Sequence, residues 1–177
     1  TLLPWRNIRS NILFPFEITG LQPDHAWIGA LLERVGLADR QNNYPRELSG
    51  GMQQRAALVR ALAMKPSVCL MDEPFGALDS FTREAMNQLV EEIFLDRPTT
   101  IVLITHSIEE AIFLSNRIIV LTAGPGHVAS EFVVDLPRPR TPEMMASRQA
   151  FDLTNTIKHV IMSEQKQAAT SAPGPQN

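Results

Sequence analysis

Three strand-sized apolar runs, with amphipathic segments between them, constrain the fold of this chain more than any other feature. The runs are 68–72, 100–105 and 118–122, and the segments between them have helical patterns over 79–95 and 107–115. An alternation of strand, helix, strand, helix and strand predicts parallel pairing with right-handed crossovers. Because the first two runs are apolar almost throughout, we expect those strands to be buried on both faces.

The residues before the first strand predict three helices. Apolar residues recur at helical spacing in two segments, and we expect Pro15 to limit the first helix and Gly36 to close the second. Ser49 is the expected N-cap of a third helix, which runs to about Met64 and is stopped by Pro66. The apolar positions of the first two helices are Trp5, Ile8, Ile12, Phe16, Ile28, Leu31, Leu32 and Val35.

The residues after the third strand predict a hairpin and then a helix. Residues 123–127 form a turn, and the alternation of apolar and acidic residues beyond it indicates an antiparallel partner for the third strand. Thr141 and Pro142 cap a last helix. The alternating residues are Glu131, Phe132, Val134, Asp135 and Leu136, and the apolar side of the helix is Leu153, Ile157, Val160 and Ile161.

The predicted fold class is therefore α/β, and we divide the chain into four parts. Residues 1–65 form a helical subdomain, and 66–140 form an α/β core with a parallel sheet. Residues 141–164 form a C-terminal helix. The tail 165–177 is rich in Ala, Ser, Gln and Pro, and we expect it to be disordered.

Composition is typical of a globular protein and excludes several other classes. With 177 residues, 44% of them hydrophobic and 20% charged, the chain can form one domain with a sizeable core. A net charge of −3 and the lack of any Lys/Arg run argue against nucleic-acid binding. Cys69 is the single cysteine and lies in an apolar run, so we expect a small buried hydrophobe. No stretch approaches the roughly 18 apolar residues that span a bilayer.

A Ser-Gly-Gly turn opens the third predicted helix. Residues 48–55 read Leu-Ser-Gly-Gly-Met-Gln-Gln-Arg. Gly50 and Gly51 have no Cβ, so an anion can approach their backbone closely, and a helix N-terminus favours negative charge. Ser49 adds a hydroxyl donor. A simple N-cap after a flexible turn would explain the same residues, so the turn alone does not decide the function.

The first strand ends in two carboxylates, since residues 68–74 read Val-Cys-Leu-Met-Asp-Glu-Pro. Side chains alternate along a strand, so Asp72 and Glu73 point to different sides and are not expected to act as one acid/base pair. The arrangement suits a division of labour, in which Asp72 reaches a Mg²⁺ ion through water and Glu73 orients an attacking water. A solvated strand end would also place two carboxylates here.

His106 follows the second strand directly. Ligands bind at the carboxyl ends of the strands in open α/β sheets, whereas no second ligand lies at metal-binding spacing from this histidine. Ser107 and Glu110 form a Ser-x-x-Glu capping box for the helix that follows. We expect Glu91 and Glu92 to lie on a solvated helix face.

Taken together, these motifs resemble the ATP-binding subunits of ABC transporters. The octet 48–55 is similar to the ABC signature motif, and 68–74 is similar to a Walker B motif with its catalytic glutamate. The resemblance implies a P-loop NTPase-like ABC ATPase fold. It also implies that Ser49, Gly50 and Gly51 contact the γ-phosphate of ATP held on a partner subunit.

Two further positions match the family. Residues 77–79 read Ala-Leu-Asp, which resembles the D-loop that crosses the dimer interface near the nucleotide, so Asp79 is a candidate nucleotide-binding residue as well as an N-cap. His106 matches the switch histidine that contacts the γ-phosphate. Met52 stands where the family commonly has Gln, and Ser107 stands where it usually has Asp.

The sequence lacks the Walker A loop of this family. That loop needs Gly-Lys followed by Ser or Thr, and none of Lys65, Lys158 and Lys166 has such neighbours. The resemblance places Walker A and the Q-loop glutamine before Thr1. We therefore expect an N-terminally truncated fragment, one that does not hydrolyse ATP alone and is molten or aggregated in isolation.

The resemblance also implies the partners and location of the complete subunit. Two copies would form a homodimer around two ATP molecules with Mg²⁺, peripheral to the cytoplasmic face of the inner membrane. The dimer would drive transmembrane permease subunits, contacted by residues 1–65, and would serve a periplasmic solute-binding protein indirectly. Residues 3–5 and 135–140 resemble importers of nitrate, sulfonate or taurine, small anions.

Two alternatives stay open from the sequence. Chromosome-maintenance and DNA-repair ATPases have a C-terminal lobe with signature and Walker B motifs but no Walker A. Such a lobe would emerge from a long heptad coiled coil, and no heptads precede Leu48. A regulatory module that has lost its P-loop is the second alternative, against which the intact Asp72, Glu73 and His106 argue.

Overall fold

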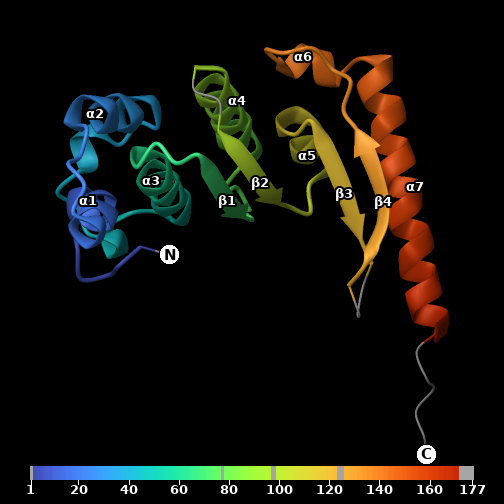
Figure 1. Cartoon of the computed structure of the whole chain (residues 1–177), viewed down its shortest axis with the longest axis horizontal. Coiled ribbons are helices and arrows are strands. Elements are labelled where there is room, and N and C mark those ends of the chain that lie inside the picture. The colour runs from blue at the N-terminus through green and yellow to red at the C-terminus, as the bar shows by residue number, and fades with distance from the viewer. Residues whose placement is uncertain (1, 77, 97–98, 123–125, 172–177) are drawn as a thin grey trace, which may run out of the picture. The chain divides into compact units, whose positions relative to one another are not determined.

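The computed structural model describes residues 2–76, 78–96, 99–122 and 126–171, with side chains as far as residue 166. The chain folds as two compact units, Thr1–Thr105 and His106–Asn177. The first holds three helices, a parallel strand pair and the helix that connects its strands (Figure 1), and the second holds a hairpin with its flanking helices.

The first unit begins with two helices that both pack against a third, α3. Each starts at a short polar side chain that accepts a backbone N–H: Asn7, Asp24 or Ser49. The predicted N-cap at Ser49 is confirmed, as is Gly36, which has φ +66° just after the second helix. The helices are α1 (Ile8–Thr19), α2 (His25–Arg34) and α3 (Gly50–Ala63), with the 3₁₀ turns η1 (Ala38–Arg40) and η2 (Pro45–Glu47) before α3.

The prediction for the first helix was wrong at both ends. Trp5 lies before α1 and is 70% exposed, so it is not part of the buried face. Pro15 lies inside α1, which continues until Gly20 ends it at φ +71°. One proline removes one helical hydrogen bond, and the burial of Ile12 and Phe16 on either side outweighs that loss.

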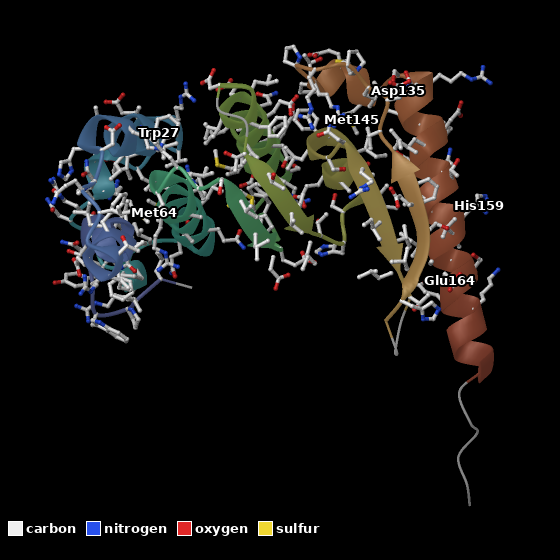
Figure 2. All side chains as sticks on the ribbon, in the orientation of Figure 1. Trp27, Met64, Asp135, Met145, His159 and Glu164 are labelled. Atoms are coloured by element: carbon white, nitrogen blue, oxygen red, sulfur yellow. The ribbon has the colours of Figure 1, made fainter. Side chains whose placement is uncertain are left out.

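A contact between α2 and the end of α3 holds the helical group together. Trp27 and Met64 are labelled there in Figure 2. The Trp27 Nε1 donates to the Leu62 carbonyl at 3.2 Å, and Lys65 Nζ lies 2.7 Å from Asp24 Oδ2. The Lys65 hydrogen bond is the main cause that lowers the pKa of Asp24, followed by the Trp27 N–H.

The strands β1 (Val68–Asp72) and β2 (Thr100–Ile104) pair in parallel, as predicted, with α4 (Ser80–Asp96) between them in the chain. The prediction that both faces are buried was wrong. Cys69 and Met71 are buried on one face of β1, whereas Leu70 is 75% exposed on the other. On β2, Ile104 is 59% exposed. The expectation for Cys69 is confirmed, and burial raises the pKa of its thiol.

A second correction concerns the acidic pair on α4. Glu92 is exposed, but Glu91 is only 2% exposed, so the pair does not form a solvated face. Helical geometry explains the difference, because Asn87 is one turn before Glu91 on the same side of α4 and is also buried.

The second unit is built on an antiparallel hairpin of β3 (Arg117–Leu121) and β4 (Val128–Val133). The predicted hairpin is confirmed, although part of its turn, 123–125, lies outside the described residues. Among the described residues β3 pairs with β4 in a sheet of its own, so it does not continue the β1–β2 sheet as the alternation predicted. A short turn makes the antiparallel partner the nearest one in sequence.

Helices cover one side of this hairpin. The last predicted helix is divided into α6 (Pro142–Met145) and α7 (Arg148–Ser171), and α7 packs along β3 and β4 (Figure 1). Ile157 of α7 is buried with Ile112 of α5 (Ile108–Leu114) and Val120 of β3. The helix α7 continues to Ser171, so the start of the predicted disordered tail is helical. Its Gln, Lys and Ala residues are good helix formers.

Two arginines close the end of α5. Arg140 is 3% exposed and donates to the carbonyls of Ile112, Phe113 and Ser115 at 2.6–3.0 Å. Arg138 donates to the Leu114 carbonyl at 2.7 Å. Desolvation and then the charge of Arg140 lower the pKa of Arg138 to about 10. The carbonyl groups that a helix leaves unpaired at its C-terminus are therefore satisfied by side chains. Within the described ranges, no helix is both long and apolar enough to cross a bilayer.

Candidate functional site

The turn that starts α3 presents backbone N–H groups at an exposed position. Ser49 and Gly50 are exposed, and the Ser49 hydroxyl accepts the Met52 N–H at 3.3 Å. Gly50 and Gly51 are the first two residues of α3, so their N–H groups have no carbonyl one turn earlier in the helix. This is the geometry with which helices bind anions.

The two glycines of this turn have different surroundings. A Cβ placed on Gly50 would meet no other atom within 4 Å. A Cβ placed on Gly51 would lie only 3.0 Å from Cδ2 of Leu78. The Leu78 side chain, 5% exposed, thus packs directly on the backbone of the turn. This contact brings the 49–51 turn next to the segment that follows β1.

At the end of β1, the two carboxylates have different environments. Asp72 is exposed and is the last residue of the strand. Glu73 is half-buried and has φ +47°, a left-handed backbone that a glutamate rarely adopts. Its N–H still donates to the Ile104 carbonyl at 2.9 Å, which extends the β1–β2 ladder by one residue. A Cβ on Gly76 would lie 3.6 Å from Glu73 Oε2, so this glycine leaves space beside the carboxylate.

Asp79 N-caps α4 through both of its carboxylate oxygens. Oδ1 accepts the Thr82 N–H at 3.0 Å, and Oδ2 accepts the Thr82 hydroxyl at 2.7 Å. These two hydrogen bonds, the backbone one first, lower the pKa of Asp79. The capping function is thus confirmed, and the structure gives both oxygens a partner within the chain. Ala77 of the same motif lies outside the described residues.

His106 is exposed at the start of the second unit and directly follows Thr105. The next residue, Ser107, N-caps α5, and its hydroxyl accepts the Glu110 N–H at 3.3 Å. This bond is the Ser side of the predicted capping box. The other candidate residues all belong to the first unit, whereas His106 belongs to the second.

The chemistry of these groups is compatible with Mg²⁺ and a polyphosphate. Among the described residues, no group of three or more His, Cys, Asp or Glu side chains could hold a metal on its own. Proteins usually bind Mg²⁺ through one or two carboxylates, with substrate phosphates and waters as the other ligands. Asp72 is an exposed carboxylate that could serve as such a ligand, and the open space at Gly50 leaves room for a phosphate.

Sequence reasoning missed several features of this region. It did not find the left-handed backbone of Glu73 or the packing of Leu78 on Gly51. It also missed Arg83, which donates to the carbonyls of Phe75 and Leu78 at 3.4 and 2.9 Å. A contact between distant segments leaves no periodic pattern in the sequence. The sequence therefore showed only that Gly51 and Leu78 both belong to motifs, and not that they touch.

Comparison with known proteins places these motifs in one family. A family model described as ABC transporter matches residues 1–76. The taurine import ATP-binding protein of Yersinia pestis is 48% identical over 129 residues, which cover 72% of this chain and 51% of that protein. The aliphatic sulfonates import ATP-binding protein of Bacillus licheniformis is 43% identical, over 88% of this chain and 64% of that protein.

Solved structures agree with the sequence relatives. The dimeric structure of a bacterial ABC transporter cassette matches with a TM-score of 0.68 and 33% identity, over 77% of this chain and 60% of that one. A second dimeric cassette, in a post-hydrolysis state bound to ADP and Pi, matches with a TM-score of 0.67 and 32% identity. The predicted P-loop NTPase-like ABC ATPase fold is thereby confirmed. The chain spans about half the length of the taurine relative.

Proposed function

We propose that this chain, which belongs to the ATP-binding proteins of ABC transporters, is the signature and Walker B part of an importer ATPase subunit. The observation that carries this proposal is the packing of Leu78 on Gly51. It joins an anion-binding helix start to the segment that follows the two carboxylates. Neither motif alone requires a nucleotide, but an anion-binding helix start and a strand that ends in two carboxylates, present in one unit, suit a protein that binds phosphates and a metal ion.

The role proposed for each group is the one that the resemblance to ABC ATPases implies. The N–H groups of Gly50 and Gly51 and the Ser49 hydroxyl bind the terminal phosphate of ATP held by a second copy. Asp72 holds Mg²⁺ through water, and the ion neutralises charge that develops on the phosphates. Glu73 orients the attacking water and accepts a proton from it. His106 contacts the terminal phosphate, and Asp79 approaches the nucleotide across the dimer.

The substrate, partners and location of the complete subunit are proposed from its relatives. Their names describe import of taurine and of aliphatic sulfonates, which supports an importer of a small anion such as nitrate, a sulfonate or taurine. The same names favour a transporter over a DNA-repair lobe. The complete subunit would act as a homodimer on permease subunits at the cytoplasmic face of the inner membrane, with a periplasmic solute-binding protein as an indirect partner. No nucleic acid is involved.

We propose that the complete subunit is longer than residues 1–177 and that these residues alone do not hydrolyse ATP, because the sequence has no Gly-Lys-Ser/Thr. The test compares Mg²⁺-dependent ATP hydrolysis by the longer protein and by this chain. In the longer protein, Glu73→Gln lowers the hydrolysis rate by about a hundredfold or more, the usual contribution of a general base, and leaves ATP binding intact.

The matched control is Glu84→Gln, which changes an exposed glutamate of α4 in the same way and leaves the rate unchanged. Equal rates for Glu73→Gln and the unsubstituted protein would contradict the role of Glu73. Hydrolysis by residues 1–177 that is lost in Glu73→Gln would contradict the proposed dependence on a separate phosphate-binding loop.

A further inference from the structure

The backbone of Glu73 is unusual for the residue that carries the proposed general base. Glu73 has φ +47°, and among the described residues only Lys65 shares a positive φ without being a glycine. A side chain keeps such a strained conformation only where the surrounding structure holds it. Because the backbone sets the direction of the Cα–Cβ bond, this conformation also decides where the Glu73 carboxylate points. The contacts that hold the backbone of Glu73 are therefore part of the site.

Hydrogen bonds hold Glu73 from two sides. Its N–H donates to the Ile104 carbonyl of β2 at 2.9 Å, and its own carbonyl accepts the Gly76 N–H at 3.3 Å. The first bond belongs to the ladder of the parallel strands. The second bond depends on residues that follow Glu73 and precede α4, where no helix or strand fixes the chain. Support on this second side must therefore come from other contacts.

Arg83 of α4 supplies that support. Its Nη2 donates to the Leu78 carbonyl at 2.9 Å, and its Nε donates to the Phe75 carbonyl at 3.4 Å. The Phe75 carbonyl also accepts the Leu78 N–H at 3.0 Å. Both side chains are buried, with Phe75 1% and Leu78 5% exposed. One guanidinium thus holds the chain just before and shortly after Gly76, the residue that bonds the Glu73 carbonyl.

Arg83 is itself fixed in the first turn of α4. Its N–H donates to the Asp79 carbonyl at 2.9 Å, and Asp79 caps the helix through Thr82. The acceptors of Arg83 are neutral carbonyls, so the shape of the guanidinium matters more than its charge. A planar guanidinium presents several donors in a fixed geometry, whereas a lysine ammonium is a compact point charge on a flexible stem.

We propose that Arg83 is a positioning residue for ATP hydrolysis, which keeps Glu73 in its left-handed conformation and so aims the carboxylate at the attacking water. Its Nε and Nη2 bond to protein carbonyls, so Arg83 acts through the Gly76 segment and not on the nucleotide. A single nucleotide is concerned, the one whose attacking water Glu73 orients. The inference rests on the proposed function, since it requires Glu73 as the general base.

The first test measures steady-state ATP hydrolysis by the longer protein with Arg83→Met. We expect kcat to fall about tenfold or more, because a misplacement of about 1 Å can cost a hundredfold. The KM for ATP stays nearly unchanged, since Arg83 does not bind the nucleotide. The matched control is Arg34→Met, which leaves both values nearly unchanged. Arg34 lies 3.9 Å from the carboxylates of Glu92 and Asp96, near the other end of α4.

The second test asks whether Arg83 acts through Glu73. It is a double-mutant cycle in which the single-turnover hydrolysis rate is measured with and without Glu73→Gln. We expect Arg83→Met to leave the residual rate of the Glu73→Gln protein nearly unchanged, because the carboxylate that Arg83 positions is already gone. A general loss of structure would instead lower the rate by the same factor in both backgrounds.

Arg83→Lys keeps the test decisive where Arg83→Met does not fold. Lysine can keep one of the two carbonyl bonds, so we expect a several-fold loss of kcat that is again absent in the Glu73→Gln background. Full kcat in the Arg83 variants, a loss in KM instead of kcat, or equal factors in both backgrounds would overturn the inference.

These outcomes are distinguishable from a failure of the proposed function. If the unsubstituted longer protein hydrolyses no ATP, or if Glu73→Gln hydrolyses it equally fast, the proposed function is wrong and the positioning role falls with it. If Glu73→Gln is impaired as expected and the Arg83 variants retain full kcat, only the positioning role is wrong.

Discussion

Two adjacent glycines at the start of α3 face different constraints. Around Gly50 the chain leaves open space, and around Gly51 the Leu78 side chain closes it. Neither glycine has a left-handed backbone among the described positive-φ residues, so alanine can adopt either backbone conformation. Side-chain space, and not backbone strain, therefore distinguishes the two positions.

Substitution of Gly50 by alanine separates ligand binding from stability. We expect Gly50→Ala to leave the free energy of unfolding unchanged or raise it by up to about 1 kcal/mol, because alanine restricts the unfolded chain. The added methyl group obstructs the phosphate, so ATP hydrolysis by the longer protein falls at least tenfold. Urea unfolding and a hydrolysis assay on the same preparation check both results. A stable variant with full hydrolysis would show that no phosphate approaches Gly50.

The left-handed backbone of Glu73 has a cost that the fold must offset. Non-glycine residues in such conformations are destabilised by about 1–3 kcal/mol. We expect Glu73→Gly to be more stable than Glu73→Ala by about 1 kcal/mol, the reverse of the usual order, because only glycine avoids the strain at φ +47°. Chemical unfolding of the two variants, made in the longer protein, measures this difference. If the alanine variant is as stable or more so, Glu73 does not have this conformation in solution.

At the scale of elements, α5 depends on side chains from a distant segment for its C-terminal end. Arg140 is buried and donates to three carbonyls in and just after the last turn of this helix. Through α5, this cap also fixes the residue that N-caps the helix, Ser107, which directly follows His106.

We expect Arg140→Met to lower the free energy of unfolding by about 3 kcal/mol or more, because it leaves several buried carbonyls without a donor at about 1–3 kcal/mol each. Arg138→Met is the matched control, since Arg138 is less buried and donates to the Leu114 carbonyl of α5. We expect it to cost about 1 kcal/mol. Denaturant midpoints of the two variants, made in the longer protein, give the comparison, and equal losses would contradict the cap described for Arg140.

Local signals predicted those element ends that depend on a capping residue. The caps Ser49, Asp79 and Ser107 and the closing Gly36 are where the sequence predicts them, because each depends on its immediate neighbours in the chain. Pro15 was misjudged, since its effect depends on how well the flanking residues pack.

Burial was predicted less well, because it depends on what covers an element. The apolar pattern of β1 and β2 predicted two covered faces, and one face is exposed at Leu70 and Ile104. Glu91 was expected in solvent and is buried. The candidate site followed from motifs, but its connection through Leu78 joins distant segments, and no spacing rule reveals it.

At the scale of the whole molecule, the exposed apolar surface limits what residues 1–177 can do alone. Leu70, Val102 and Ile104 share one face of the parallel pair and are 75%, 49% and 59% exposed. Each such side chain forgoes roughly 1.5–3 kcal/mol of burial, and three of them together approach the about 5–15 kcal/mol stability of a domain.

We therefore expect the isolated 177-residue chain to be molten or aggregated, without a cooperative unfolding transition. Scanning calorimetry and the binding of a hydrophobic dye measure this on the purified chain. The longer protein serves as the control and is expected to unfold cooperatively. A sharp transition of the isolated chain, without dye binding, would show that this apolar face does not destabilise it.

The central claim is that the 49–51 turn of one copy binds the terminal phosphate of a nucleotide held by the other. A crystal structure of the longer protein, trapped as Glu73→Gln with ATP and Mg²⁺, tests it directly. The account predicts N–H groups of Gly50 and Gly51 about 3 Å from oxygens of that phosphate. A trapped dimer in which this turn faces solvent, or lies away from the triphosphate, would contradict it.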